Sequence, residues 1–143
     1  MDVHRGTRRR GAPDLLALLA LALFAGTCSG GGPLASVGAP YFPFDAPALY
    51  REWWSQVESC AIRTGIFDRV DWQQVADDPD GTFPCGRRRC SGAWKAPHTI
   101  YVAESHMWSQ PLVKHEMVHD LIQSPNHLDQ AFYSCGVHDI GHP

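Results

Sequence analysis

The sequence predicts a small α+β domain held together by disulfides, and three observations support this fold class. The chain has 143 residues, a length typical of one domain. Segments whose apolar residues recur with helical period flank a short run of β-branched and aromatic residues typical of a strand. The cysteines beyond the N-terminal region are even in number, which indicates disulfides in an exported chain. With 44% apolar and 19% charged residues, the composition excludes a disordered polyelectrolyte.

Residues 1–27 have the pattern of a secretory signal peptide. A cluster of arginines, Arg5 and Arg8 among them, precedes an uninterrupted apolar run over residues 15–24. That run is too short to span a bilayer, which needs about 20 residues, but it fits the apolar region of a signal sequence. Cys28 lies where a bacterial lipoprotein carries its lipid anchor, and ordinary signal-peptide cleavage nearby is the alternative. We therefore expect an exported protein that is periplasmic, lipid-anchored in the cell envelope or extracellular.

The exported part of the chain is mildly acidic. Removing residues 1–27 leaves 8 Lys and Arg against 13 Asp and Glu, a formal net charge of −5. This charge gives no electrostatic support for binding nucleic acid or an anionic membrane. Residues 28–44 are rich in Gly, Pro and Ser and are predicted to form a flexible linker. The domain itself is expected over residues 45–143.

A first helix is predicted from Ala48 to about Thr64. Asp45 is expected to cap its start, Pro47 suits its first turn, and Gly65 is expected to end it. Its apolar residues recur with helical period: Leu49, Trp53, Trp54, Val57, Ala61 and Ile62.

The cysteines of the domain are Cys60, Cys85, Cys90 and Cys135, which allow three pairings. Because Cys85 and Cys90 enclose a short loop, we favour a bond between them and a second bond between Cys60 and Cys135. The second bond would tie the first helix to the C-terminal region. A zinc–cysteine site is the competing interpretation, but the spacing is not that of paired C-x2-C motifs.

The rest of the chain is predicted to hold two strands and a long helix. Residues 66–75 show partial alternation and are expected to form a strand, and residues 77–97 form a disulfide-bearing loop. Residues 99–103 (TIYVA) are a second strand. A helix follows from about residue 110 to residue 123 and is ended by a Ser-Pro pair. One further helical turn is expected near residues 129–133.

The long helix carries the motif H-E-x-x-H. His115 and His119 are four residues apart, so they lie on one face of the helix about one turn apart. Two imidazoles placed in this way can bind one Zn²⁺. Glu116 follows the first histidine and would act as general base toward the nucleophilic water, then as general acid toward the leaving amine. Chance matches to so short a motif are common, but a helix with apolar flanks behind a strand is the context that favours a metal site.

This segment, HEMVHDL behind the strand TIYVA, resembles the zincin-type metallopeptidases over residues 98–135. The resemblance implies a small zincin-like domain with an active-site helix packed against a short β-sheet. It also implies zinc as cofactor and a peptide or protein as substrate. By analogy with zincins, Thr99–Ala103 would form the rim of the cleft and pair with substrate as an added strand. The simpler interpretation is that Thr99–Ala103 is only a core strand under the helix.

A catalytic zinc needs a third protein ligand. The metzincin spacing fails because Pro125 stands where the third histidine would be, and no Glu follows Glu116 for the gluzincin pattern. His127 is the best candidate, since a turn after the helix would bring it back to the metal. The alternatives are Asp129, His138, Asp139 and His142.

Other side chains are weaker candidates. Asp120 would either orient a metal-bound histidine or be a solvated helix residue. Tyr133 would either stabilise an oxyanion or be a core aromatic. His106 is expected on the surface. The run Arg87–Arg89 is expected to be a solvated loop, with contact to an acidic substrate as the alternative.

Together these observations predict an exported zinc metallopeptidase. Zinc would be held by His115, His119 and His127, with Glu116 as the catalytic residue. The principal alternative is a secreted binding or structural module that holds zinc without turnover, in which a fourth side chain would close the site. A third possibility is a disulfide-stapled adhesion domain without metal.

Overall fold

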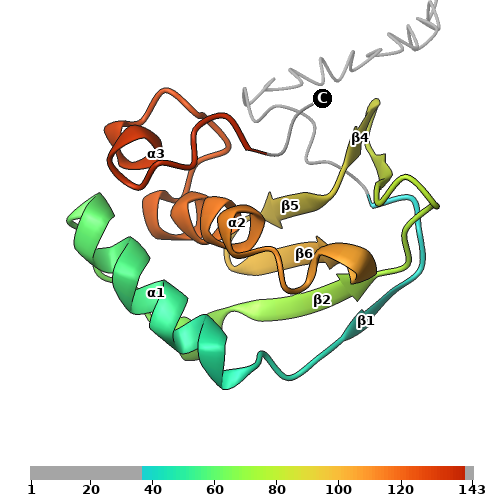
Figure 1. Cartoon of the computed structure of the whole chain (residues 1–143), viewed down its shortest axis with the longest axis horizontal. Helices are drawn as coiled ribbons and strands as arrows, with labels where there is room; N and C mark the ends of the chain where they lie inside the picture. Colours follow the sequence, from blue (N-terminus) through green and yellow to red (C-terminus); the bar gives the residue numbers. More distant parts are fainter. Residues whose placement is uncertain (1–36, 141–143) are drawn as a thin grey trace, which may run out of the picture. The chain divides into compact units, whose positions relative to one another are not determined.

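The computed structural model describes residues 37–140, so the predicted signal peptide, Cys28 and His142 lie outside the described residues. The elements follow one another along the chain in Figure 1: β1 (Tyr41–Pro43), α1 (Ala48–Ala61), the 3-10 turn η1 (Phe67–Arg69), β2 (Asp71–Val75), β3 (Phe83–Cys85), β4 (Arg88–Cys90), β5 (Gly92–Lys95), β6 (Thr99–Ala103), the 3-10 turn η2 (Glu104–His106), α2 (Gln110–Ile122) and α3 (Gln130–Ser134). The predicted α+β class is confirmed.

Four strands form the main sheet in the order β1-β2-β6-β5. β2 and β6 are parallel, with Trp72 opposite Ile100, whereas β1 and β5 run antiparallel to their neighbours. In this order β5 is an edge strand, and β6 is paired on both sides. β3 and β4 form a separate antiparallel hairpin, residues 83–90, called the β3–β4 hairpin below.

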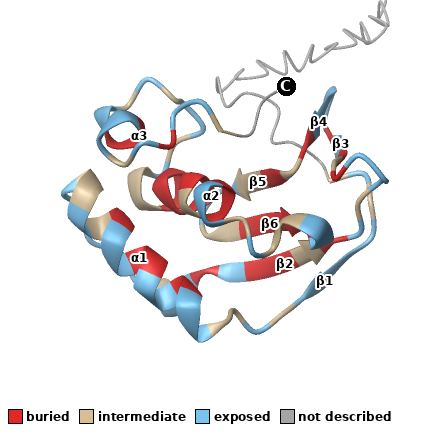
Figure 2. Cartoon of the chain, viewed as in Figure 1, coloured by how far each residue is buried: buried red, intermediate tan, exposed pale blue. Residues whose placement is uncertain are grey.

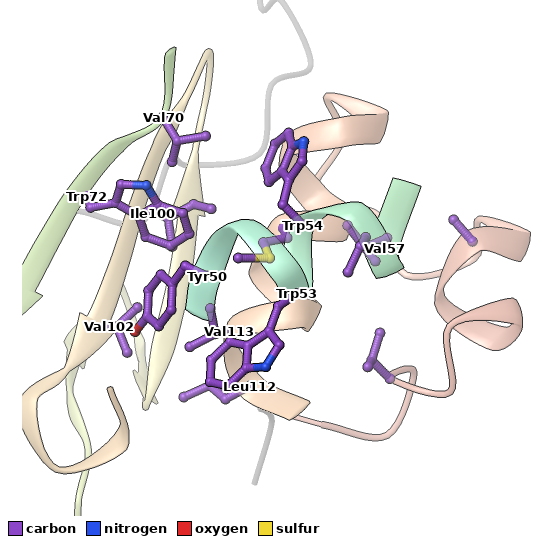
Figure 3. Packing of buried hydrophobic residues seen from close by; sticks show 14 of the residues in the cluster. Tyr50, Trp53, Trp54, Val57, Val70, Trp72, Ile100, Val102, Leu112 and Val113 are labelled. Carbon is purple, nitrogen blue, oxygen red and sulfur yellow. The ribbon is translucent and has the colours of Figure 1, made fainter. Parts of the chain in front are cut away.

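The two faces of the sheet have different coverings. Side chains of a strand alternate between faces, so Ile100 and Val102 point to one side and Tyr101 and Ala103 to the other. Ile100 and Val102 belong to the main core, where they meet α1 and α2 (Figures 2 and 3). Tyr101 and Ala103 belong to a smaller cluster with residues of the β3–β4 hairpin. The main core is aromatic-rich: Tyr50, Trp53, Trp54 and Trp72 are all buried in it.

The first helix was predicted with the right start but the wrong end. It begins at Ala48 after Pro47, and Asp45 makes no capping hydrogen bond to it. It ends at Ala61 because Ile62 adopts the left-handed conformation, with φ 53°. Gly65 has a packing role instead, since a Cβ there would lie 2.5 Å from Leu121 Cδ2.

Three other sequence expectations are wrong in part. Residues 77–97 are not a loop, because they hold β3, β4 and β5. The predicted linker, residues 28–44, includes β1 at its end, where backbone pairing with β2 orders a Pro- and Gly-rich stretch. Residues 66–75 begin with the turn η1 rather than with strand. Short strands of this kind arise from tertiary pairing more than from their own periodicity.

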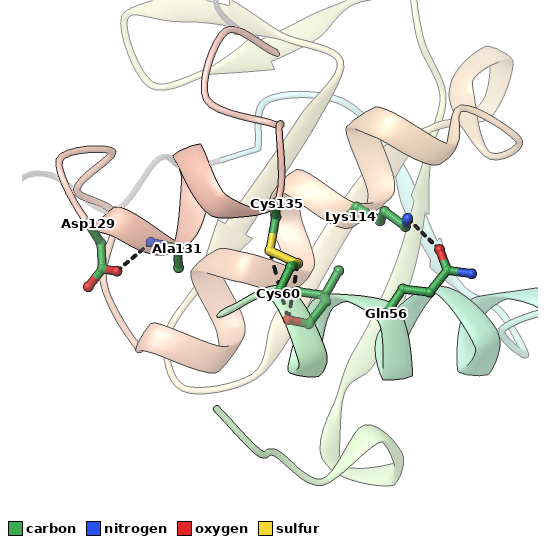
Figure 4. The surroundings of a disulfide bond; sticks show 7 residues. Gln56, Cys60, Lys114, Asp129, Ala131 and Cys135 are labelled. Carbon is green, nitrogen blue, oxygen red and sulfur yellow. Dashed lines mark hydrogen bonds between the residues drawn. A yellow bond between two sulfur atoms is a disulfide. The ribbon is translucent and has the colours of Figure 1, made fainter. Parts of the chain in front are cut away.

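The predicted disulfides are confirmed. Cys60 at the end of α1 is bonded to Cys135 directly after α3, and Cys85 is bonded to Cys90 within the β3–β4 hairpin (Figure 4 shows the first). Two disulfides in a small domain indicate an oxidising compartment. None of the helices in residues 37–140 is long and apolar enough to cross a membrane.

Candidate metal centre

The helix α2 carries the H-E-x-x-H motif on a side that is buried, not solvated. It follows Ser109, has Pro111 in its first turn, and ends where Gln123 adopts the left-handed conformation, in agreement with the predicted span. His115, Glu116 and His119 expose only 1%, 3% and 5% of their surface. Polar side chains are rarely buried so completely without a specific partner.

Three histidines converge at one point. The Nε2 atoms of His115 and His119 are 3.2 Å apart, and each lies 3.0 Å from Nε2 of His127. His127 comes from the loop after α2 and is half-buried. The structure thus brings together the three side chains that the sequence proposed as metal ligands.

Backbone carbonyls fix the orientation of the two helical histidines. His115 Nδ1 donates to the carbonyl of Val137 at 2.7 Å, and His119 Nδ1 donates to the carbonyl of Ser124, also at 2.7 Å. A carbonyl oxygen can only accept, so in the neutral imidazoles the proton is on Nδ1 and the Nε2 lone pair points inward. Metal-binding histidines are held in this way in many proteins.

A series of short turns presents His127. Gln123 and Ser124 donate from their backbone N–H groups to the carbonyl of His119, which ends the helix. Ser124 Oγ then accepts from Asn126 N, and Asn126 Oδ1 accepts from Leu128 N. Side-chain oxygens that bind the backbone two residues on are typical of tight turns. The loop that carries His127 is therefore locally ordered by its own hydrogen bonds.

Two aromatic rings that the sequence analysis did not single out line the histidine cluster. Phe132 of α3 is fully buried, and its ring centroid lies 4.7–5.0 Å from those of all three histidines. Trp94 of β5 stacks on His119 with an interplanar angle of 15°. Neither residue has a sequence signal that links it to the motif, because both are placed by tertiary packing alone.

The geometry and the donor set fit a single metal ion. Three nitrogens that bind one zinc tetrahedrally at 2.0–2.1 Å are separated by about 3.3–3.4 Å. The observed separations of 3.0–3.2 Å are slightly shorter. Imidazole nitrogens turned toward one another by fixed tautomers are the ligands that Zn²⁺ prefers, and a cation removes the repulsion between their lone pairs.

Glu116 lies beside the histidine cluster, against the edge strand. A Cβ on Gly92 of β5 would come within 2.8 Å of Glu116 Oε1 and 3.0 Å of its Cγ, so only glycine leaves room for this side chain. Burial raises the pKa of Glu116 from its ordinary 4.5 to about 8. A divalent cation nearby would favour the ionised form and lower that pKa.

Asp120 has neither of its two predicted roles. It is buried rather than solvated, and it does not bind the metal-site histidines. Its Oδ1 accepts from Trp94 Nε1 at 2.9 Å, and His98 Nδ1 lies 3.2 Å from its Oδ2. Burial raises the pKa of Asp120, whereas its bonds to Trp94 and His98 lower it. Asp120 therefore anchors Trp94, the ring that stacks on His119.

Three of the four alternative third ligands, Asp129, His138 and Asp139, lie elsewhere, and His142 is outside the described residues. Asp129 caps α3 by accepting from Ala131 N (Figure 4). His138 Nε2 is 2.8 Å from Asp139, and its ring stacks on that of Tyr133. Tyr133 is half exposed and is not a core aromatic as the sequence suggested. Within residues 37–140, no other His, Cys, Asp or Glu joins the three histidines.

A cleft of about 390 Å³ opens beside the site along the edge of β5. Its lining includes Glu116, His119 and His127, together with β5 and the tip of the β3–β4 hairpin. A larger hollow of about 660 Å³ near the start of α1 is lined by no histidine or cysteine. The cleft on β5 is therefore the one with access to the candidate metal ligands.

Comparison of the chain with models of protein families, with curated proteins and with solved structures finds no match. The interpretation of the site accordingly depends on its own residues and geometry.

Proposed function

We propose that this protein is an exported, zinc-dependent peptidase of the zincin type. The observation that carries the proposal is that three imidazole nitrogens converge beside a buried glutamate, and that this glutamate and two of the histidines line one cleft. His115, His119 and His127 would hold the ion. When bound, zinc supplies Lewis acidity that polarises a carbonyl and lowers the pKa of water to about 7.

Glu116 is the residue that moves protons in this proposal. It follows the first ligand in the motif and lines the same cleft as His119 and His127. Its carboxylate would accept a proton from the attacking water and pass it to the departing amine nitrogen. Gly92 leaves space for the carboxylate because it has no side chain. Burial of Glu116 keeps bulk water from competing for the proton.

The substrate would pair with β5 rather than with Thr99–Ala103. By analogy with zincins the sequence analysis gave Thr99–Ala103 that role, with a core strand as the other interpretation. This strand is β6, whose two neighbours already occupy its backbone groups. β5 is the edge strand, and Gly92, Ala93 and Trp94 line the cleft. An extended peptide added to this edge would pass the metal site.

The alternative of a zinc-holding module without turnover requires a fourth ligand that closes the site. In residues 37–140 no such ligand is present, and His138 and Asp139 contact each other instead. His142 lies outside the described residues and is the remaining candidate. Lipid attachment at Cys28 would place the domain on the cell envelope and is part of the proposal for localisation.

The metal assignment is tested by elemental analysis of the purified protein. We expect one zinc per chain, with affinity reduced by at least a hundredfold in His127→Ala. His138→Ala serves as the matched control, because it removes an imidazole from the same region without touching the cluster, and its zinc content should be unchanged. Absence of zinc from the folded, oxidised protein would overturn the proposal.

The catalytic assignment is tested with Glu116→Gln. This change keeps the size of the side chain and removes the proton acceptor, so zinc should remain bound while hydrolysis of a peptide library falls by a factor of at least about 100. Mass spectrometry of the library reads the cleavage directly. Equal hydrolysis by the variant would show that Glu116 is not the base.

A further inference from the structure

The tip of the β3–β4 hairpin carries two arginines at the mouth of the cleft. The turn is formed by Gly86 and Arg87, with Gly86 at φ 65° as in two-residue hairpin turns that place glycine first. The Cys85–Cys90 disulfide closes the hairpin directly behind this turn. Arg87 and Arg88 both line the cleft that Glu116, His119 and His127 also line.

The third arginine of the run points elsewhere. Successive residues of a strand face opposite sides, so Arg88 and Arg89 cannot share a face. Arg89 donates to Asp78 and to Thr82 Oγ1, and it forms an ion pair with Asp80 at 3.4 Å. Arg89 is thus neutralised by the loop that precedes β3, and its role is structural.

Arg87 and Arg88 have no such neutralising partners. Within residues 37–140 neither forms an ion pair, and both are exposed. Among residues 37–140, Glu116 is the only acidic residue in the lining of the cleft. The sequence as a whole has an excess of acidic residues, so the two arginines make the mouth of the cleft a local exception to that charge.

We propose that Arg87 and Arg88 select substrates that carry a carboxylate beside the scissile bond. This inference rests on the proposed peptidase function and adds its substrate class. A guanidinium presents paired N–H donors that match the two oxygens of a carboxylate. The crosslink fixes the backbone of the hairpin that carries both residues beside the cleft, so little backbone freedom is lost when a substrate binds.

The proposal is tested with matched synthetic peptides in which one Glu is moved along an otherwise uncharged sequence, and with the same set carrying Gln. We measure hydrolysis by the zinc-loaded protein and binding to zinc-loaded Glu116→Gln by fluorescence anisotropy. At one or two adjacent positions we expect Glu to be preferred over Gln about tenfold, falling as salt is raised. The double variant Arg87→Gln/Arg88→Gln should lose this preference and bind and cleave Glu and Gln peptides equally well.

Two single variants serve as controls for charge. Arg89→Gln removes a charge from the other face of the same hairpin, and Arg69→Gln removes an exposed charge from η1. Both should keep the preference for Glu. Two outcomes would overturn the proposal and leave the peptidase function intact. In one, the preference for Glu survives in the Arg87→Gln/Arg88→Gln variant. In the other, the wild type cleaves Gln peptides but shows no preference for Glu.

Two further results separate this inference from the function on which it rests. Binding of Glu peptides that depends on Arg87 and Arg88, without hydrolysis of any peptide, would keep carboxylate recognition and reject the peptidase. Peptides that end in a free carboxylate or in an amide distinguish a terminal carboxylate from a side-chain carboxylate. Faster cleavage of peptides with a free C-terminal carboxylate would mean that the same arginines bind the C-terminus of the substrate.

Discussion

The two disulfides of this domain stabilise regions with different tasks. Cys60–Cys135 joins residues 75 apart and ties α1 to the C-terminal segment, defined here as residues 124–137. Cys85–Cys90 joins residues 5 apart and closes only the β3–β4 hairpin. The C-terminal segment supplies His127 and the carbonyls of Ser124 and Val137, whereas the hairpin supplies Arg87 and Arg88.

The two regions therefore serve different proposed sites. The C-terminal segment belongs to the metal site, and the β3–β4 hairpin belongs to the substrate site. A crosslink that closes a long loop removes more entropy from the unfolded chain than one that closes a short loop. The long crosslink accordingly stabilises the C-terminal segment, which positions the third histidine, His127. The short crosslink fixes the shape of a hairpin tip whose backbone is already paired.

The largest effect is expected when the long crosslink is removed. The double variant Cys60→Ser/Cys135→Ser should lose about 4 kcal/mol of unfolding free energy, as the chain-entropy relation gives for a loop of this length. Zinc affinity should fall as well, because the C-terminal segment is then held only by packing. Urea unfolding followed by tryptophan fluorescence, together with zinc titration, measures both. Unchanged zinc affinity in a destabilised variant would show that the segment docks without the crosslink.

A large effect of pH on the free energy of unfolding is also expected. It acts through the carboxyl group of Glu116, which lines the cleft together with residues of both regions. Its pKa is about 8 in the folded protein and 4.5 in the unfolded chain, so the folded state binds the proton more tightly. The contribution of Glu116 to the unfolding free energy of the zinc-free protein should therefore be largest below pH 4.5. It should fall as the pH rises to about 8. The loss is on the order of 5 kcal/mol.

Glu116→Gln is the matched variant for this pH dependence. Glutamine does not ionise, so the decline between pH 4.5 and 8 should disappear from chemical denaturation curves of the zinc-free variant. Zinc should also reduce the decline in the wild type by favouring the carboxylate. A decline of equal size in the variant would assign it to another group.

Removal of the short crosslink should cost less. For Cys85→Ser/Cys90→Ser we expect a loss of about 2 kcal/mol, with zinc affinity unchanged. The Glu-over-Gln preference of hydrolysis should weaken, because the hairpin tip is less ordered. A fall in zinc affinity equal to that of the Cys60→Ser/Cys135→Ser variant would remove the distinction between the two regions.

Gly92→Ala tests the contact between β5 and the carboxylate of Glu116, the proposed general base. The added methyl group would press on Glu116 and on Leu112, an overpacking cost of about 1–2 kcal/mol. Peptide hydrolysis should fall while zinc remains bound, since the histidines do not touch this position. Gly38→Ala, the same change at a glycine outside the lining of the cleft, is the control and should leave hydrolysis near the wild-type level.

The smallest effect is expected from Arg89→Gln. The ion pairs of Arg89 with Asp78 and Asp80 are exposed and screened by salt, so their removal should change the melting temperature only slightly, and less at high salt. Thermal unfolding at low and high salt checks this. A large loss of stability would mean that the loop before β3 supports the hairpin more than its exposure indicates.

Sequence reasoning succeeded where the relevant contacts are local. The pairing of His115 with His119 follows from the helix period, and the return of His127 follows from a short turn after the helix end. The disulfide pairing was also predictable, because Cys85 and Cys90 are so close in sequence that the remaining pair follows.

It failed where side chains meet through tertiary packing. Trp94 lies in a segment that was predicted to be loop, yet β5 places it on His119. The same strand takes the sheet edge that was assigned to Thr99–Ala103. Phe132 and the carbonyl of Val137 reach the site only after α3 docks, and nothing in their local pattern indicates it.

The division of the three histidines between α2 and the C-terminal segment has a consequence for timing. A nascent chain with α2 formed holds only two of the proposed ligands, and two imidazoles bind zinc far more weakly than three. The third lies on a loop ordered by its own hydrogen bonds, but it gains its packing against Phe132 only when α3 has docked, which the Cys60–Cys135 bond then makes durable. Metal capture would therefore mark the completion of folding in an oxidising compartment and would keep the cleft inactive before that point.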